Sequence, residues 1–198
     1  MSEQIYIFKI FERIWHWGQA ALIFFLMLTG FEVHGLYDNF GFEKAVNLHT
    51  IGAWTLIGLW LFAIFWHITT GEWKQYIPST KNVTAMGKYY LSGIFKGAPH
   101  PHRLTQLTKH NALQKLAYLF ILVFVGPLIW ATGWLYLFYD QWAAWGLGGL
   151  SLSYVALGHL LGAYMMLLFV IAHVYLTTTG ATPLAHIKAM ITGWEKVH

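Results

Sequence analysis

Residues 154–178, YVALGHLLGAYMMLLFVIAHVYLTT, form a long apolar run without Lys, Arg, Asp or Glu, and they contain His159 and His173. On an α-helix, the fourteen-residue spacing of these histidines gives a rise of about 21 Å and returns to nearly the same face. A hydrocarbon core is about 30 Å thick, so the two imidazoles are expected at two depths of a membrane. Ligand-capable side chains are costly there unless the protein satisfies them. This face is therefore expected to hold two stacked cofactors.

The composition is typical of an integral membrane protein. Hydrophobic residues make up 57% of the 198 residues, charged residues make up 10%, and the mean hydropathy is +0.50. A soluble domain carries about 25% charged residues. Cysteine is absent from the sequence, which excludes cysteine-ligated iron–sulfur clusters, disulfides and C-x-x-C-H attachment of c-type haem in this chain. The net charge of +4 comes from residues that flank apolar segments, so no nucleic-acid partner is expected.

Four apolar segments are long enough to cross a bilayer as helices, at about residues 14–33, 46–69, 113–138 and 154–178. The sequence therefore predicts an all-α, integral membrane four-helix bundle that forms a single domain over residues 1–198. The first segment has no small-residue cleavage pattern after it, so it is expected to remain as a span. Gly126 and Pro127 are expected to kink the third span. No internal repeat is strong enough to use.

The basic residues set the predicted orientation. Eleven of the twelve fall on one side of the membrane: Lys9, Arg13, Lys74, Lys81, Lys88, Lys96, Arg103, Lys109, Lys115, Lys188 and Lys196. On the other side Lys44 is accompanied by acidic residues: Glu32, Asp38, Glu43 and Asp140. The positive-inside rule then places both termini and the long second connection in the cytoplasm.

That long cytoplasmic loop between the second and third spans is predicted to contain an interfacial helix. The helix would begin near Pro78–Thr80 and end near Phe95, with Lys81 and Lys88 on its polar side. A loosely ordered loop is the alternative. The following GAPHPHR segment (residues 97–103) is expected to be extended, because each proline restricts the residue before it.

The predicted orientation sorts the membrane histidines into two levels. An inner level has His16, His67 and His173, and an outer level has His34, His49 and His159. Haem b with two axial histidines needs one imidazole from each of two helices at the same level. His16 is the favoured inner partner of His173, because Trp15 and Trp17 flank it and Arg13 could meet a haem propionate. His49 is the favoured outer partner of His159, whereas His34 is expected in solvent and His67 stays open.

This pattern resembles the dihaem cytochrome b subunits of respiratory complexes. These include the formate dehydrogenase gamma subunit, the thiosulfate reductase cytochrome b subunit and the nickel–iron hydrogenase b-type cytochrome. The segment KHNALQKLAYL (residues 109–119) resembles the K-x-N-x-x-Q-K run before the third span of the first two. GPLIWATGW (residues 126–134) is similar to their G-P-L-x-x-x-T-G pattern.

The resemblance implies two haem b groups, an inner one held by His16 and His173 and an outer one held by His49 and His159. It also implies a menaquinone or ubiquinone site near the inner haem. The site residues it implies are Asn111 and the backbone around Leu113. His110, next to Asn111, is a candidate proton donor to the quinone, and a solvated loop histidine is the alternative. The formate dehydrogenase pattern favours glycine where this chain has Leu113.

The function implied is a membrane-anchoring subunit of the bacterial or archaeal inner membrane. It would carry electrons between a periplasmic-side iron–sulfur or multihaem partner and a quinone at the cytoplasmic side, in either direction. One alternative is a stand-alone cytochrome b561-like quinone or superoxide oxidoreductase. Another is a cofactor-free anchor or transporter, although transport paths usually contain carboxylates within the membrane.

Overall fold

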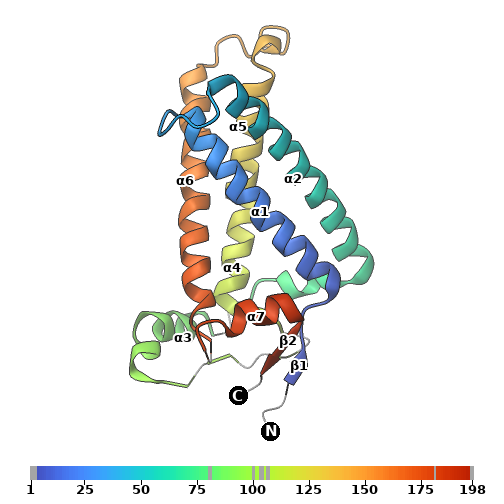
Figure 1. The fold of residues 1–198 in the computed structure, drawn as a ribbon, viewed down its shortest axis with the longest axis vertical. Coiled ribbons are helices and arrows are strands. Elements are labelled where there is room, and N and C mark those ends of the chain that lie inside the picture. The colour runs from blue at the N-terminus through green and yellow to red at the C-terminus, as the bar shows by residue number, and fades with distance from the viewer. Residues whose placement is uncertain are drawn as a thin grey trace. The chain divides into compact units, whose positions relative to one another are not determined.

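The computed structural model describes residues 4–79, 82–99, 101–102, 105, 108–180 and 182–196. In these residues, four helical segments are long and apolar enough to cross a membrane: α1 (Ile10–Val33), α2 (Phe42–Thr70), Ala112–Leu137 and α6 (Leu152–Thr177). Ala112–Leu137 consists of α4 (Ala112–Phe120), a π-helical turn (Ile121–Val125) and α5 (Gly126–Leu137). The predicted all-α architecture with four spans is confirmed (Figure 1).

The contacts within the chain separate it into two compact units. Unit 1 comprises Met1–Gln75, Leu104–Lys109 and Gly180–His198, and unit 2 comprises Tyr76–Arg103 and His110–Thr179. In unit 1, α1 packs against α2, and in unit 2, α5 packs against α6. Each unit is therefore built on one pair of neighbouring long helices. The interpretation of the chain as a single domain stays a prediction.

In unit 1, the buried carboxylate of Glu32 joins the end of α1 to the start of α2. Its Oε1 accepts hydrogen bonds from the backbone N–H groups of Asn39 (3.0 Å), Phe40 (2.5 Å) and Gly41 (2.9 Å). Gly41 precedes α2 and has a φ of +84°, which favours glycine. The N-terminus of a helix attracts negative charge, so Glu32 caps α2 from the preceding helix.

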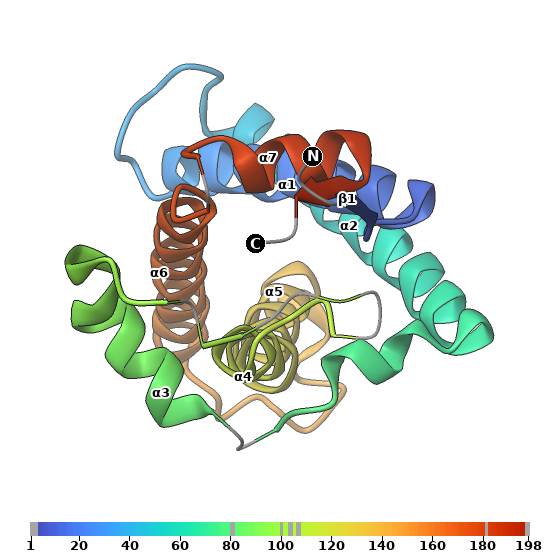
Figure 2. The ribbon, with the colours of Figure 1, turned by 90° about the horizontal axis from the view of Figure 1, so that it is seen from below.

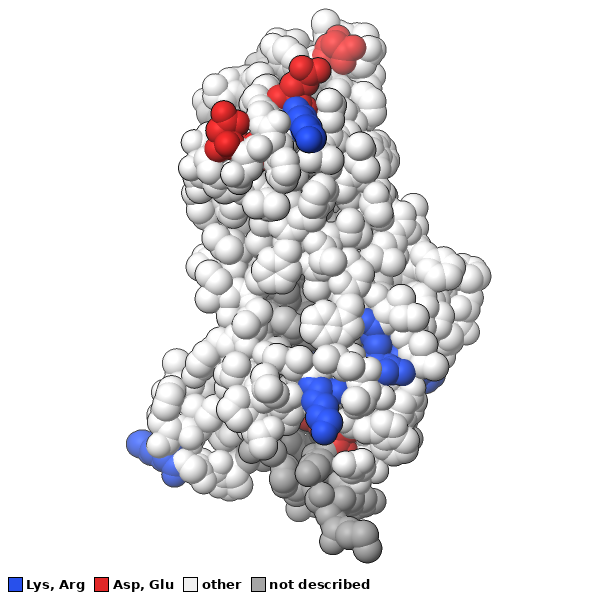
Figure 3. Space-filling view, viewed as in Figure 1, with Lys and Arg blue, Asp and Glu red and all other residues white. Residues whose placement is uncertain are grey.

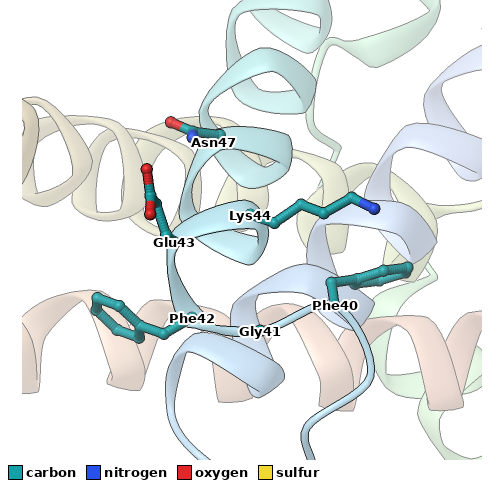
Figure 4. Close-up of a pocket in the computed structure, with 6 residues that line it drawn as sticks. All are labelled: Phe40, Gly41, Phe42, Glu43, Lys44 and Asn47. Carbon is teal, nitrogen blue, oxygen red and sulfur yellow. The ribbon is translucent and has the colours of Figure 1, made fainter.

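Beside this capped terminus lies a shallow hollow whose lining side chains point in two directions (Figure 4). Lys44 extends toward the ring of Phe40, with 5.8 Å between Nζ and the ring centroid. Glu43 and Asn47 point the other way. On the face drawn in Figure 3, the described charged side chains gather near the helix ends, and the surface between those ends is uncharged. That distribution fits helices that cross an apolar medium.

At the opposite end of α1, unit 1 contains a cluster of four charged side chains. The Lys109 ammonium lies 2.7 Å from Glu12 and 3.0 Å from Glu72, and only 4% of its side chain is exposed. Lys9 contacts the second oxygen of Glu72 at 2.6 Å. Burial raises the pKa of Glu72, but the hydrogen bonds from Lys9 and Lys109 outweigh burial, so the net shift is downward. Each buried charge is therefore compensated within the cluster.

A small two-stranded sheet and a short helix, which the sequence did not predict, complete unit 1. Strand β1 (Gln4–Tyr6) pairs antiparallel with β2 (Trp194–Lys196), and α7 (Ala185–Thr192) precedes β2. Figure 2 shows β1 beside the end of α7. Gly193 joins α7 to β2 with a φ of +87°, and a Cβ there would lie 2.5 Å from the Tyr6 ring. Only glycine fits this turn.

In unit 2, the predicted interfacial segment is helical but irregular. Helix α3 (Val83–Lys88) continues through a π-helical turn (Tyr89–Gly93) and a 3₁₀ turn (Ile94–Lys96). Met86 is fully buried, whereas Leu91 and Phe95 are 82% and 75% exposed. The interfacial position stays a prediction, and Lys81, His100 and Arg103 lie outside the described residues.

The third span departs from α-helical geometry next to the predicted Gly126–Pro127 site. Gly126 donates its backbone N–H to the carbonyl of Ile121, five residues earlier, which closes a π-helical turn. Pro127 follows at the start of α5 and has no N–H to donate. Proline and π-helical turns are both causes of helix bending, so the interruption has a local explanation in the sequence.

Candidate haem-ligand and quinone site

His49, a predicted outer ligand, is held by Thr29 and Gly30 of α1. The Thr29 hydroxyl lies 3.0 Å from His49 Nδ1 and 2.9 Å from the carbonyl oxygen of Phe25. Thr29 is fully buried. A Cβ on Gly30 would lie 3.1 Å from His49 Cε1, so this imidazole rests directly against the α1 backbone. The ring is thus held by one hydrogen bond and by one close packing contact.

His159, the other predicted outer ligand, is held in the same way within unit 2. The Thr132 hydroxyl lies 2.9 Å from His159 Nδ1 and 2.5 Å from the carbonyl oxygen of Leu128. A Cβ on Gly133 would lie 3.3 Å from His159 Cε1. The Tyr136 ring meets the imidazole edge-on, at 5.9 Å between ring centroids. In each of the two helix pairs, a histidine on one helix therefore contacts a threonine and the following glycine on the other.

The match extends along both helix pairs. Each histidine lies seven residues beyond the first residue of its helix, Phe42 in α2 and Leu152 in α6. Three residues after each histidine, Gly52 and Gly162 lie so close to the partner helix that a Cβ would meet its side chains at 2.9 Å and 2.6 Å, respectively. The sequence analysis found no internal repeat strong enough to use, but the structure shows a short pattern that occurs once in each helix pair. The missed signal is Thr-Gly on one helix and His-x-x-Gly on the next, occurring twice.

At the predicted inner level, unit 1 contains two histidines. His16 is partly buried and meets the Trp17 ring edge-on at 5.2 Å. His67 is buried, donates from Nδ1 to the Ala63 carbonyl at 2.7 Å, and contacts Trp66 and Trp15 edge-on. The sequence left the role of His67 open. A packing role is consistent with its burial and with these contacts. His34, by contrast, is exposed as expected.

Arg13, one turn before His16, is engaged inside unit 1. Its Nη1 donates to the carbonyl oxygen of Ile191 in α7 at 2.5 Å, and Trp17 Nε1 donates to the neighbouring Met190 carbonyl at 3.2 Å. Both bonds attach α7 to the start of α1. These contacts indicate that Arg13 helps to orient α7, and the suggestion that Arg13 could meet a haem propionate stays a prediction.

His173, the remaining predicted ligand, belongs to a row of rings in unit 2. It stacks on Phe169 at 5.6 Å and 19°, and Phe169 meets Tyr118 at 6.5 Å. Tyr118 in turn meets His110 edge-on at 5.1 Å, and His110 also contacts Tyr76 at 5.2 Å. The row joins the predicted inner ligand to the predicted quinone segment through consecutive side chains.

Asn111 itself is buried, 3% exposed, and caps the N-terminus of α4. Its Oδ1 accepts the Gln114 N–H at 2.9 Å, while Gln114 Oε1 accepts the Asn111 N–H at 2.9 Å. This capping box explains why Asn and Gln stand three residues apart. One hydrogen of the Asn111 side-chain amide goes to the Tyr90 hydroxyl at 3.1 Å. An amide has two such hydrogens, so a second donor is left for another acceptor.

Two further features of this segment bear on ligand binding. Leu113 is the second residue of α4, where backbone N–H groups have no carbonyl partner within the helix. Tyr90 was not predicted as a site residue. Burial raises the pKa of its phenol and outweighs the opposing hydrogen bond from Asn111, so the hydroxyl keeps its proton at neutral pH. Donors therefore gather at the start of α4.

The histidine contacts described above can be compared with what haem and metal-ion sites require. Searched over the described part of the chain, no group of three or more His, Asp or Glu side chains is arranged to hold a metal ion. Single histidines held on different helices are instead what haem with two axial imidazoles requires. The threonine contacts of His49 and His159 fit that requirement, since each engages Nδ1, and Nε2 is the nitrogen that would bind iron.

Helical spans that carry such histidines are what a membrane-embedded cytochrome of the b type requires. The sequence model of the prokaryotic cytochrome b561 family matches residues 7–193, and the chain belongs to this family. Membership implies b-type haem and a multi-pass protein of the bacterial inner membrane. The predicted cytochrome b family is thereby confirmed.

Two curated relatives are similar to the chain. The putative cytochrome YdhU of Escherichia coli K12 is 28% identical over 200 residues, covering 98% of this chain and 76% of the relative. A putative protein-methionine-sulfoxide reductase subunit, YedZ1 of Azospira oryzae, is 26% identical over 154 residues, covering 67% of this chain and 74% of the relative. No solved structure matches the chain.

Proposed function

We propose that this protein is a dihaem cytochrome b that carries electrons across the inner membrane between a periplasmic-side redox partner and quinone at the cytoplasmic side. The proposal rests on the matching contacts of His49 with Thr29 and of His159 with Thr132. They select these two histidines, from several in the chain, as a pair presented in the same manner. The pair would hold the outer haem, and His16 and His173 would hold the inner one. Each haem, when bound, supplies a one-electron Fe(III)/Fe(II) couple.

The ligand pairing is tested by counting haem in four single variants, each with histidine replaced by alanine. His49→Ala and His159→Ala should each remove one haem, and the double variant should still contain one. His16→Ala and His173→Ala should each remove the other haem, which the pyridine haemochrome spectrum and a redox titration identify. His67→Ala is the matched control and should keep both. Loss of a haem in the control together with retention in His16→Ala would reassign the inner ligand to His67.

The quinone site is proposed at the start of α4. Quinone reduction consumes two electrons and two protons, so the site must bind the head group and deliver protons. The second amide hydrogen of Asn111 and the first-turn N–H of Leu113 are suited to bind a quinone carbonyl, and His110 to pass a proton. The ring row from His110 to His173 supports a location beside the inner haem. Quinol oxidation would use the same groups in reverse.

Replacements of Asn111 separate its two roles. Asp at this position keeps an oxygen for the helix cap but has no amide hydrogens, whereas Ala loses both. Asn111→Asp should therefore keep both haems and the stability of α4 but lose quinone reduction by at least about tenfold, measured as haem oxidation by a quinone analogue. Normal quinone kinetics in a haem-replete Asn111→Asp variant would remove Asn111 from the site.

A periplasmic-side partner is part of the same proposal. YedZ1, to which the chain is similar, is described as a subunit of a protein-methionine-sulfoxide reductase, and the predicted orientation places the outer haem on the periplasmic side. The family description also fits a stand-alone cytochrome b561-like oxidoreductase. Co-purification of the chain, expressed at its native level with a small tag, decides between them: a stoichiometric redox subunit supports the partner.

A further inference from the structure

The hydrogen bonds that Thr29 and Thr132 make with His49 and His159 specify which ring nitrogen carries the proton. A threonine hydroxyl has one hydrogen. In Thr29 that hydrogen points to the Phe25 carbonyl, which can only accept, at 2.9 Å, and in Thr132 it points to the Leu128 carbonyl at 2.5 Å. Toward the imidazole, each hydroxyl oxygen must then act as an acceptor. Nδ1 of both histidines is therefore the protonated nitrogen, and Nε2 has the lone pair.

The glycine beside each threonine holds the ring in place for this bond. Each Cε1 atom lies where a Cβ on Gly30 or Gly133 would approach to 3.1 Å or 3.3 Å. Contacts that short are tighter than ordinary van der Waals packing, so a larger residue would push the imidazole away from the helix. The two residues thus act together: the glycine leaves space for the imidazole ring, and the threonine hydroxyl forms a hydrogen bond with it.

We propose that Thr29 and Thr132 are a matched pair of positioning residues that fix His49 and His159 in the Nε2-ligating tautomer and thereby set the potential of the haem they bind. This inference rests on the proposed ligand pairing. An acceptor on Nδ1–H makes the imidazole a more basic ligand. A more basic ligand favours Fe(III) over Fe(II), so the two hydroxyls hold the midpoint potential of this one haem down.

Other threonines in the spans show that the hydroxyl–carbonyl bond alone is ordinary. Thr55 of α2 donates to the Ile51 carbonyl at 2.8 Å, with the same four-residue spacing, but its side chain is on an exposed position. Such bonds satisfy a hydroxyl in an apolar setting. Thr29 and Thr132 differ because their second contact is a histidine nitrogen. Thr55 therefore provides a matched control.

The test uses the full-length protein with Thr29→Val, Thr132→Val, the corresponding Ser variants and Thr55→Val. Valine has the shape of threonine without the hydroxyl, and serine keeps the hydroxyl. Haem content, the midpoint potential of each haem and low-temperature EPR spectra of the ferric state are measured. We expect both Val variants to raise the potential of the same haem, with a change of up to about tenfold in its Fe(III)/Fe(II) equilibrium, or 59 mV. Serine and Thr55→Val should leave it unchanged.

The outcomes separate this inference from the ligand assignment beneath it. If His49→Ala and His159→Ala remove different haems, the pairing fails. If they remove the same haem but neither Val variant shifts its potential or EPR signal, only the role of the threonines fails. A Val variant that loses this haem while its Ser counterpart keeps it supports the role, because serine keeps the hydroxyl and valine keeps only the shape of threonine. Equal shifts in both haems, or a shift in Thr55→Val, would overturn it.

Discussion

At the scale of single residues, Thr29 and Thr132 make the hydroxyl–carbonyl bond common in membrane helices and also contact a histidine nitrogen. The apolar surroundings and helical spacing of His159 and His173 were enough to predict ligands from the sequence. Their supporting threonines were not predictable in this way, because threonine in a membrane helix usually satisfies its own hydroxyl locally. Only the side-chain positions distinguish Gly30 and Gly133, whose missing Cβ atoms give space to an imidazole.

Replacing either of these glycines should therefore displace a ligand. Gly30→Ala and Gly133→Ala are expected to lower retention of the outer haem by about tenfold during detergent washing, in line with the usual cost of disturbing a ligand's support. Haem per protein is the measurement. Gly58→Ala in α2, where a Cβ would meet nothing within 4 Å, should keep both haems. Equal losses in all three variants would point to general destabilisation.

At the scale of elements, hydrophobic runs identify the spans, but their ends depend on polar groups. Helices α1 and α2 begin at Ile10 and Phe42, about four residues before the apolar segments taken from the sequence. Glu32 accounts for the second of these starts, because its carboxylate captures three successive N–H groups at the entry to α2. A carboxylate at a span end was visible in the sequence, but the bonds it makes across a turn were not.

Removing that carboxylate should weaken the turn between α1 and α2. Glu32→Ala leaves the N–H groups of residues 39–41 without their acceptor, and we expect a loss of about 1–2 kcal/mol in the free energy of unfolding. Thermal unfolding in detergent, followed by the loss of haem absorbance, measures it. Glu43→Ala, which removes an exposed carboxylate from the same helix end, is the comparison and should cost about 0.5 kcal/mol.

At the scale of the whole molecule, the sequence correctly predicted the fold class and the family, but not how the chain divides into two units. Unit 1 joins segments from both halves of the chain, and its β1–β2 sheet has only three residues in each strand. Strands that short have no periodic pattern to detect, and a pairing between Gln4–Tyr6 and Trp194–Lys196 depends on contacts across almost the whole sequence. Long-range pairing of this kind follows from the three-dimensional structure alone.

An ion pair next to this sheet should make it sensitive to pH. His186 Nδ1 lies 2.7 Å from Glu195, and the hydrogen bond raises the pKa of His186 above 6.5, against the effect of burial and with help from the negative charge. Since the folded pKa is the higher one, the stabilisation is complete below 6.5 and is lost as pH rises through the folded value.

Hydrogen exchange of α7 and β2, corrected for intrinsic rates, should therefore be faster at about pH 8.5 than at about pH 5.5. His186→Gln should remove most of this difference, whereas His34→Gln, at an exposed position, should preserve it. An unchanged pH dependence in His186→Gln would show that another group is responsible.

The β1–β2 sheet also constrains the timing of biosynthesis. Strand β1 lies ahead of every span, while α7 and β2 follow α6, so the ribosome must deliver all four spans before β1 meets its partner. Until then, Arg13 and Trp17 lack the α7 carbonyls that they bind in the finished protein. Unit 1 therefore cannot mature during translation of its own helix pair. The sheet can form only after the spans of unit 2 have been synthesised, which makes it one of the last parts of the chain to fold.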